Sequence, residues 1–338
     1  MMVKKVTIKD IARELGTTTS TVSRAISNSD GISEKKRKQV LAKARAMGYE
    51  PNLFARQLRQ GGSRTIGLIV PRINRVFFSN VIHGVEIIAR EKGYSVIICQ
   101  SHENKVREDE NIKTLISNHV AGILMSVSME SEKADTHLEI QKRNIPFVMF
   151  DRVFEKLDAN KVLNDNFHAA RQLTEHLIEQ GYGRIVHFAG PENINIYRER
   201  LRGFLAGLEK HGINPEKGQI LGNVLTKEKG LEETNRLIET SYPFDAIFAA
   251  SDYSALGALL SLKEHRIDVP GMVGVAGFAN EPFTELLELT TVDQQSTEMG
   301  KTAARLLFEG IESMPDKTNK EIVIKPELII RNSTLKTG

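Results

Sequence analysis

From Thr65 onward, short runs of Val, Ile, Leu and Phe alternate with longer amphipathic stretches, and this alternation limits the folds available to the chain. The apolar runs are IGLIV from Ile66, SVIIC from Ser95, GILMSV from Gly122, PFVMF from Pro146, RIVHFAG from Arg184, a run around Ile220, AIFAA from Ala246 and VGVAG from Val273. Stretches of roughly 12 to 16 residues with helical periodicity separate most of them, as at 81–92, 108–118, 169–180 and 254–265. This pattern predicts parallel sheets covered by helices on both faces. The number of predicted strands exceeds that of a single sheet of ordinary size, so we expect two α/β subdomains.

In sheets of this kind, ligands bind at the carboxyl ends of the strands. The residues that directly follow the predicted strands are therefore the first candidates for a binding site. They are the segment 72–78, Ser126, the pair Asp151-Arg152, the pair Ser251-Asp252 and the segment 278–281. The pair Asp151-Arg152 admits two interpretations, a structural ion pair or contact with a ligand.

The first 50 residues show a different pattern, centred on TIKDIARELGTTTSTVSRAI from Thr7. Apolar residues between Ile8 and Leu15 recur at the spacing of one helix face, and Thr7 before them is a plausible N-cap. Gly16 ends this helix, and a second helix can start from Thr18. Two short helices joined by a tight turn that contains glycine predict a helix-turn-helix motif.

The outward face of the second helix carries small polar residues and an arginine. Short hydroxyls and a guanidinium can reach base edges in the major groove, and Thr19, Ser20 and Arg24 fit that need. Contacts with phosphates suit Thr18, Thr21 and Ser23. An ordinary polar helix face would look the same in isolation, so the interpretation depends on the rest of the chain.

Charge is distributed unevenly along the sequence. Residues 1–63 contain 13 Lys and Arg against 5 Asp and Glu, whereas the whole chain has a net charge of only +3. Ser33 begins a third helix whose first turns carry Lys35 to Lys38, where the helix dipole disfavours cations unless phosphates lie nearby. A solvated charged face is the alternative. A basic head on an acidic body suggests that only the head meets a polyanion.

The segment from Pro51 to Gln60, closed by Gly61-Gly62, links the head to the body. Asn52 can cap a helix of about two turns, which is too short to persist alone in water. We expect it to form when DNA and a second copy of the chain bury it, which would make it a coupling element. An inert tether is the alternative.

Composition places the chain among ordinary globular proteins, with 40% hydrophobic and 26% charged residues. The single cysteine, Cys99, lies in the run SVIIC and is predicted to be a buried core thiol. The N-terminal MMVKKVTIKD lacks the apolar stretch of a signal peptide, and no run reaches membrane-spanning length. These features lead us to expect a cytoplasmic protein without membrane contact.

The chain lacks common sequence signatures of enzymes. It has no G-x-S-x-G, no G-x-x-x-x-G-K-[ST] and no G-x-G-x-x-G after a strand. Its nine His residues are scattered, and none pairs with another His or an acid at the spacing of metal ligands. We therefore expect neither an enzyme nor a bound metal or cofactor.

Taken in order, the motifs of the chain resemble those of the lactose-repressor (LacI/GalR) family of bacterial transcription regulators, over essentially the whole sequence. In the head and linker the resemblance rests on VTIKDIARELGTTTSTVSRAIS, MGYEPN and NLFARQLR. In the body it rests on TIGLIVPRINRVFFSNVIHGVE, VMFDR, RERLRGFLAGL, ASDYSALG, LTTVDQ and ELIIRNST. One such segment would be suggestive, and the ordered set is hard to obtain otherwise.

The resemblance implies a small all-α helix-turn-helix head and a core like that of periplasmic binding proteins, built from two parallel-sheet subdomains. The expected divisions are a head at 1–50, a hinge helix and linker at 51–63, an N-subdomain at 64–163 with 292–325, and a C-subdomain at 164–291 with 326–338. Three chain crossovers would join the subdomains, near 162–165, 291–293 and Lys325. We expect a homodimer, since no further apolar heptad segment comes after ELIIRNST.

The resemblance also assigns residues by position. The residues expected to contact DNA are Thr7, Thr18, Thr19, Ser20, Thr21, Ser23, Arg24, Ser33, Tyr49, Asn52, Ala55 and Leu58, of which Ala55 and Leu58 would enter the minor groove and bend the duplex. The residues expected to line an effector cleft are Arg75, Phe77, Phe78, Ser126, Asp151, Arg152, Arg200, Ser251, Asp252, Asn280 and Gln294. Arg200 and Asp151 are expected to hold the effector from opposite subdomains.

Two positions depart from the family pattern. A strand-end position that is often an effector-binding Asp is Ala279 here, so we expect Asn280 or Glu281 to replace its function. The segment usually written Asn-Pro-Phe-Phe begins with Arg75-Val76. Both departures bear on the identity of the effector.

The function predicted from the sequence is that of a DNA-binding transcriptional regulator, a repressor that binds a pseudo-palindromic operator as a dimer. A small polar metabolite, a sugar or sugar phosphate, would control it from the cleft, and a nucleobase effector or an activator role stays open. A solute-binding protein that uses the same core for transport is the rival from another class. The basic head and the missing export signal argue against that rival.

Overall fold

The computed structural model describes residues 6–27, 31–49, 63–215, 218–312 and 318–336, and the chain divides into two units between Ser63 and Arg64. The described residues of the first unit form three helices, α1 (Ile8–Glu14), α2 (Thr19–Ser27) and α3 (Glu34–Ala46). Each helix contributes one fully buried residue to a small apolar core, namely Ile11, Val22 and Val40.

Local hydrogen bonds fix the ends of these helices where the sequence predicts them. The backbone N–H and the hydroxyl of Thr7 both donate to the Asp10 carboxylate, at 3.0 and 2.7 Å, and so hold the first turn of α1. Gly16 has a φ of +56°, which lets the chain turn sharply after α1. Helix α3 begins after Ser33, whose side chain accepts from the Lys36 N–H. The helix-turn-helix prediction is confirmed, with α2 starting one residue later than expected.

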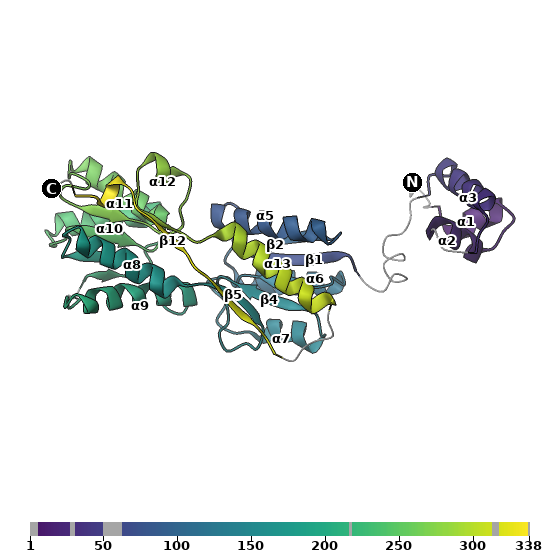
Figure 1. Ribbon diagram of the computed structural model, residues 1–338, viewed down its shortest axis with the longest axis horizontal. Coiled ribbons are helices and arrows are strands. Elements are labelled where there is room, and N and C mark those ends of the chain that lie inside the picture. Colours follow the sequence, from purple (N-terminus) through teal and green to yellow (C-terminus); the bar gives the residue numbers. More distant parts are fainter. Residues whose placement is uncertain (1–5, 28–30, 50–62, 216–217, 313–317, 337–338) are drawn as a thin grey trace. The chain divides into compact units, whose positions relative to one another are not determined.

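The second unit contains two parallel sheets (Figure 1). The larger sheet has the strand order β11-β5-β4-β3-β1-β2, in which every neighbouring pair is parallel. Its strands are β1 (Thr65–Val70), β2 (Ser95–Gln100), β3 (Ile123–Met125), β4 (Phe147–Phe150), β5 (Asn160–Asn164) and β11 (Glu321–Ile324). Helices α5 (Val76–Glu91) and α13 (Ser296–Glu312) cover one face, and α6 (Lys105–Ser117) and α7 (Asp135–Lys142) cover the other. We call this part the N-subdomain.

The smaller sheet has the order β7-β6-β8-β9 and is also parallel throughout. Its strands are β6 (Ile185–Phe188), β7 (Ile220–Leu221), β8 (Ala246–Ala249) and β9 (Gly274–Ala276). Helices α8 (Asn166–Glu179) and α9 (Asn195–Lys210) pack on one face, and α10 (Lys227–Glu239) and α11 (Asp252–Glu264) pack on the other. We call this part the C-subdomain.

The chain passes between the two sheets three times. It crosses from β5 into α8, returns through β10 (Thr291–Asp293) into α13, and crosses again from β11 to β12 (Glu327–Ile329). Strands β10 and β12 pair antiparallel and form the ribbon that runs between the subdomains in Figure 1. Two short elements, α12 (Phe283–Leu286) and the 3-10 helix at Asn332–Thr334, complete the C-subdomain.

Helices α5 and α13 touch at the level of their backbones. A Cβ atom built on Gly84 would lie 2.2 Å from the Thr297 carbonyl oxygen, and one built on Gly300 would lie 2.2 Å from the Val81 carbonyl oxygen. Neither contact leaves room for a side chain, so the two glycines set the distance between the helices.

The eight strands predicted from apolar runs are all present, but four others were not predicted. Strands β5, β10, β11 and β12 have three to five residues each and carry polar side chains, so hydrophobicity alone does not reveal them. The prediction that Cys99 is buried is wrong. Strand β2 lies at the edge of its sheet, and Cys99 is only half-buried there beside the exposed Ile98.

Candidate DNA-binding and effector-binding sites

Helix α2 presents the predicted base-reading residues to solvent. Val22 and Ala25 are buried on its inner face, whereas Thr19, Ser20 and Arg24 are exposed. Among the described residues, the Arg24 guanidinium has no hydrogen bond or ion pair with another side chain. Its donor fork is therefore available to a base edge.

The residues predicted for phosphate contact already support the helix start. The Thr18 hydroxyl accepts from the Thr21 N–H at 3.2 Å and lies 2.8 Å from the Ser20 hydroxyl. Thr7 and Ser33 are exposed at the starts of α1 and α3, while Ser23 and Tyr49 are half-buried. The remaining predicted DNA contacts, Asn52, Ala55 and Leu58, lie outside the described residues.

In the second unit, the predicted effector residues gather where strands of both sheets end. Ser126 comes directly after β3, the pair Asp151-Arg152 after β4, and Arg75 is the N-cap residue of α5 after β1. Phe78 is buried and packs edge-on against Phe77, with ring centroids 5.1 Å apart. The strand-end rule therefore places these N-subdomain residues at one edge of the sheet.

The pair Asp151-Arg152 is part of a larger buried network. Arg152 Nη1 donates to Glu103 Oε2 at 2.8 Å, and its Nε lies 4.0 Å from Asp151 Oδ2. Glu103 also accepts from the Met129 N–H at 3.0 Å. Burial raises the pKa of Asp151 to about 6, against the opposing effect of Arg152 and then Arg200. Glu103 was not predicted from the sequence, although it lies just after the carboxyl end of β2 and the strand-end rule could have found it.

Arg200 reaches this edge from the C-subdomain, in the second turn of α9. It is 3% exposed, and its three guanidinium nitrogens donate to Asn166 Oδ1, the Ala250 carbonyl and Gln294 Oε1 at 2.9, 2.8 and 3.0 Å. Its guanidinium carbon lies 3.8 Å from the centroid of the Phe278 ring. Burial lowers its pKa to about 10, and Asp151 is among the groups that oppose this. Asp151 and Arg200 thus interact electrostatically from opposite subdomains.

Asp252, in the first turn of α11, is fully buried and links α11 to the crossover strand β10 and to the loop after β9 through hydrogen bonds. Its Oδ1 accepts from the Thr291 hydroxyl at 2.6 Å, and its Oδ2 accepts from the Glu281 N–H at 2.8 Å. Burial raises its pKa to about 6. The preceding residue, Ser251, caps α11 by accepting from the Tyr253 N–H at 3.3 Å.

The loop after β9 has an unusual backbone. Ala279 and Asn280 have φ values of +141° and +53°, backbone conformations that residues other than glycine rarely adopt. The Asn280 side chain donates to Asp293 at 3.2 Å and accepts from Arg331 at 3.1 Å. These bonds give Asn280 a role within the C-subdomain, and Glu281 becomes the stronger candidate to replace the missing carboxylate at Ala279.

The two subdomains also contact each other directly near this edge. The Asn195 amide donates to the Asp151 carbonyl at 2.9 Å, and its oxygen accepts from the Val153 N–H at 3.1 Å. The Arg75 guanidinium carbon also lies 3.9 Å from the centroid of the Tyr253 ring.

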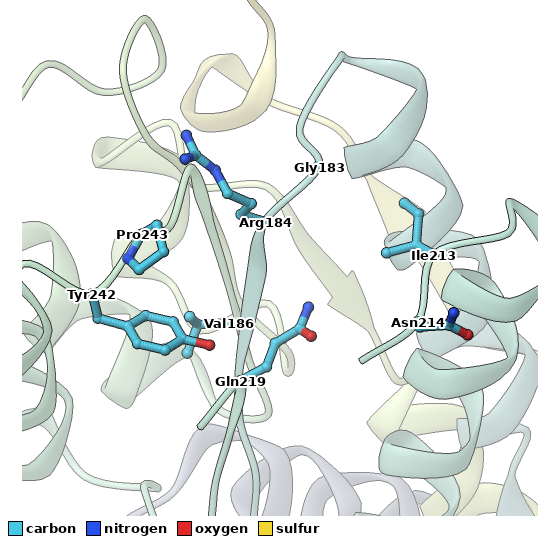
Figure 2. A pocket seen from close by; sticks show the side chains of 8 residues that line it. All are labelled: Gly183, Arg184, Val186, Ile213, Asn214, Gln219, Tyr242 and Pro243. Carbon is cyan, nitrogen blue, oxygen red and sulfur yellow. The ribbon is translucent and has the colours of Figure 1, made fainter. Parts of the chain in front are cut away.

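One cavity lies near these elements, and another lies at the amino-terminal ends of the C-subdomain strands. A groove of about 410 Å³ separates α7 and the loop after β4 from the start of α9, and its wall includes Leu138, Phe154, Lys156, Asn193 and Arg198. A second cavity, of about 30 Å³, lies beside Gln219 and Tyr242 (Figure 2). It is lined by Gly183, Arg184, Val186, Ile213, Asn214 and Pro243 as well, and it has room for little more than water.

Neither metal binding nor membrane crossing finds support in the described part of the chain. Among those residues, no group of three or more His, Cys, Asp or Glu side chains is arranged to hold a metal ion. None of the helices there combines the length and the apolarity needed to cross a membrane.

Comparison with known proteins identifies the head and the body. Residues 7–52 match the family described as "Bacterial regulatory proteins, lacI family", and residues 174–334 match the one described as "Periplasmic binding protein-like domain". The chain is 34% identical to the HTH-type transcriptional repressor CytR of Escherichia coli (strain K12), over 97% of this chain and 96% of that repressor. The chain belongs to the lacI family of bacterial regulatory proteins.

Other lacI-family proteins agree with this assignment. The ribose operon repressor of Halalkalibacterium halodurans is 30% identical over 97% of both chains. The solved structure "transcriptional regulator CelR-cellobiose complex" is 27% identical, with a TM-score of 0.74, and the likeness covers 97% of this chain and 100% of that one.

The lacI-family assignment confirms several predictions made from the sequence. The fold is a helical helix-turn-helix head with an α/β core of two parallel sheets. The chain is a DNA-binding repressor and not an enzyme. The rival interpretation, a solute-binding protein used for transport, is therefore rejected.

Proposed function

We propose that this repressor binds a pseudo-palindromic operator as a homodimer and that a small polar metabolite, held between the N- and C-subdomains, controls its affinity for DNA. One observation carries the proposal. Buried charged side chains from both subdomains, Asp151 and Arg200, interact where the strands of both sheets end. A ligand placed there contacts both subdomains and favours the conformation in which they approach each other.

The proposed divisions of the chain are a head at 1–50, a hinge and linker at 51–63, an N-subdomain at 64–163 with 292–325, and a C-subdomain at 164–291 with 326–338. The strand pairings support these divisions, because β11 (Glu321–Ile324) joins the sheet of β1–β5 after the chain has built the C-subdomain. Within the head, Thr19, Ser20 and Arg24 read bases, and Thr18, Thr21 and Ser23 contact phosphates. In the hinge, Ala55 and Leu58 enter the minor groove.

Two of the similar proteins support a sugar as the effector. One similar solved structure is a complex of the regulator CelR with cellobiose, and one curated relative is a ribose operon repressor. Carboxylates and amides are the groups that accept from and donate to sugar hydroxyls, and the candidate site holds Asp151, Asn166 and Gln294 together with Arg200. A nucleoside is the second candidate, because aromatic rings such as Phe278 and Tyr253 line the same region.

Two measurements test the proposal. Gel-shift titrations with genomic fragments would identify an operator, and the protein should bind it at least a thousandfold more tightly than random duplex at matched salt. A thermal-shift screen of sugars and nucleosides would identify an effector, since a ligand that binds the folded state raises the melting temperature. That ligand should then change operator affinity by about 5- to 150-fold. A ligand that binds without changing operator affinity would contradict the control mechanism.

A further inference from the structure

The carboxylate of Glu281 is a buried acid without a partner among the described residues. Glu281 comes after the strained Ala279-Asn280 turn at the carboxyl end of β9 and is 4% exposed. Its backbone N–H donates to Asp252, but its carboxylate makes no hydrogen bond or ion pair with any described residue. The oxygens of this carboxylate are not among the fully enclosed unpaired atoms of the described residues, so they reach solvent and are accessible to a ligand that donates a hydrogen bond.

The charged groups around Glu281 favour a ligand that offers a hydrogen-bond donor over a ligand that carries an anionic group. Burial and, second, the neighbouring Asp252 carboxylate raise the pKa of Glu281 to about 7, against the opposing effect of Arg75. Arg75 belongs to the opposite subdomain, so Glu281 faces across the boundary between the subdomains. The Arg75 guanidinium lies over the Tyr253 ring, and Glu228 is a second acid within its electrostatic reach. A phosphate placed beside Arg75 would therefore meet two carboxylates.

The other arginines of the region are already engaged. Arg200 uses all three of its nitrogens in hydrogen bonds within the protein. Arg152 donates to Glu103, and Arg72 lies 3.6 Å from the same carboxylate. In the described part of the chain, the charge of Arg152 is balanced by Glu103 and Asp151, although its Nε has no hydrogen-bond partner, and each nitrogen of Arg200 already donates within the protein.

We propose that Glu281 determines specificity, so that the effector is an unphosphorylated molecule that presents an O–H or N–H donor to this carboxylate, and phosphorylated analogues are rejected. The inference rests on the proposed function, since it concerns the effector of the same site. A phosphoryl group would add negative charge beside Glu281 and Asp252, whereas a hydroxyl or amino group would donate to a carboxylate that has no partner among the described residues. This choice separates the two classes that the sequence left open, sugars and sugar phosphates.

The test uses matched pairs of probes on the full-length protein. The pairs are D-ribose and D-ribose 5-phosphate, D-glucose and D-glucose 6-phosphate, cytidine and cytidine 5′-monophosphate, and adenosine and adenosine 5′-monophosphate. Thermal shift and calorimetry give the dissociation constant of each member for the wild type, for Glu281→Gln, which removes the charge, and for Glu281→Asp, which keeps it. Glu285→Gln is the matched control, because Glu285 is an exposed carboxylate four residues away.

We expect the unphosphorylated member of at least one pair to bind at least tenfold more tightly than its phosphorylated partner. Glu281→Gln should reduce that ratio to less than threefold, whereas Glu281→Asp and Glu285→Gln should preserve it. The proposal is overturned if a phosphorylated probe binds as tightly as its partner, if Glu281→Gln leaves the ratio unchanged, or if no unphosphorylated probe binds. An unphosphorylated probe that binds with this dependence on Glu281 but leaves operator affinity unchanged would contradict the proposed function and support the specificity role.

Discussion

The side-chain amide of Asn195 donates to the backbone carbonyl of Asp151 at 2.9 Å and accepts from the Val153 N–H at 3.1 Å. One residue at the start of α9 therefore holds the loop after β4 in the other subdomain. It does so by bonding to a backbone carbonyl and a backbone N–H, as a neighbouring strand would. Its two bonds stabilise the arrangement in which the subdomains approach each other.

Asn195→Ala should favour separation of the subdomains. Loss of two hydrogen bonds, each contributing about 0.5–1.5 kcal/mol, should weaken effector binding by roughly 5- to 150-fold and increase the radius of gyration in solution scattering. Asn193→Ala is the control, because Asn193 is exposed two residues earlier and lies outside these bonds. Equal effector affinity and equal scattering for the two variants would show that Asn195 does not hold the subdomains together.

Arg24→Ala should weaken binding to the operator by about 1–3 kcal/mol while leaving binding to random duplex nearly unchanged, because a bidentate base contact discriminates sequence. The exposed guanidinium at this position has no partner among the described residues of the head. Arg45→Ala removes the same charge from the exposed side of α3 and serves as the control. Equal losses on operator and random DNA would assign Arg24 to phosphate contact instead.

Elements that depend on interactions between residues close in the sequence could be predicted, and elements that depend on distant residues could not. The eight strands with apolar runs and the helix ends at Thr7, Gly16 and Ser33 depend on local periodicity and capping, which the sequence shows directly. Strands β5 and β11 depend on pairing between residues about 160 positions apart, as Val162 with Ile322, and nothing local reveals it.

The residues of the candidate site also fall into a part that could be predicted from the sequence and a part that could not. The strand-end rule located Ser126, Asp151 and Arg152, because parallel strands bring their carboxyl ends to one edge. It could not reveal that Arg200 would be held by Asn166 and Gln294, since those bonds join residues from three separate elements. The bonding partners of a buried polar group depend on tertiary packing, which residue type and spacing do not determine.

Glu281→Gln should stabilise the protein at pH 8 and have little effect at pH 5. The folded pKa of Glu281, about 7, lies above its ordinary value of 4.5, so the folded state binds a proton more tightly than the unfolded state does. The wild type therefore loses stability as pH rises from about 4.5 to 7, by at most roughly 3 kcal/mol from this group. Asp151 contributes in the same direction in both proteins and cancels in the difference.

Melting temperatures of the wild type and Glu281→Gln between pH 5 and pH 8 would measure this effect. Glu285→Gln should behave like the wild type within about 0.5 kcal/mol at every pH, since Glu285 is exposed. A constant difference between the wild type and Glu281→Gln across the whole range would show that Glu281 is charged throughout and paired in solution.

Arg200→Ala should destabilise the second unit by about 3–5 kcal/mol, because it removes the donor to three buried acceptors and leaves them unpaired. Arg200→Lys should lose less, since an ammonium group can still donate to part of this set. Urea denaturation monitored by circular dichroism measures both. A loss below about 1 kcal/mol for Arg200→Ala would mean that water replaces the guanidinium without cost.

The position of β11 at the outer edge of the larger sheet has a consequence for the order of folding during synthesis. The four strands of the C-subdomain sheet lie within residues 185–276, so the ribosome has released all of them before Glu321 is made. The N-subdomain begins first but cannot pair β5 with β11 until almost the whole chain has emerged. The C-subdomain can therefore complete its sheet while β5 still has an open edge, and that edge is the part of the nascent chain most exposed to association with other strands.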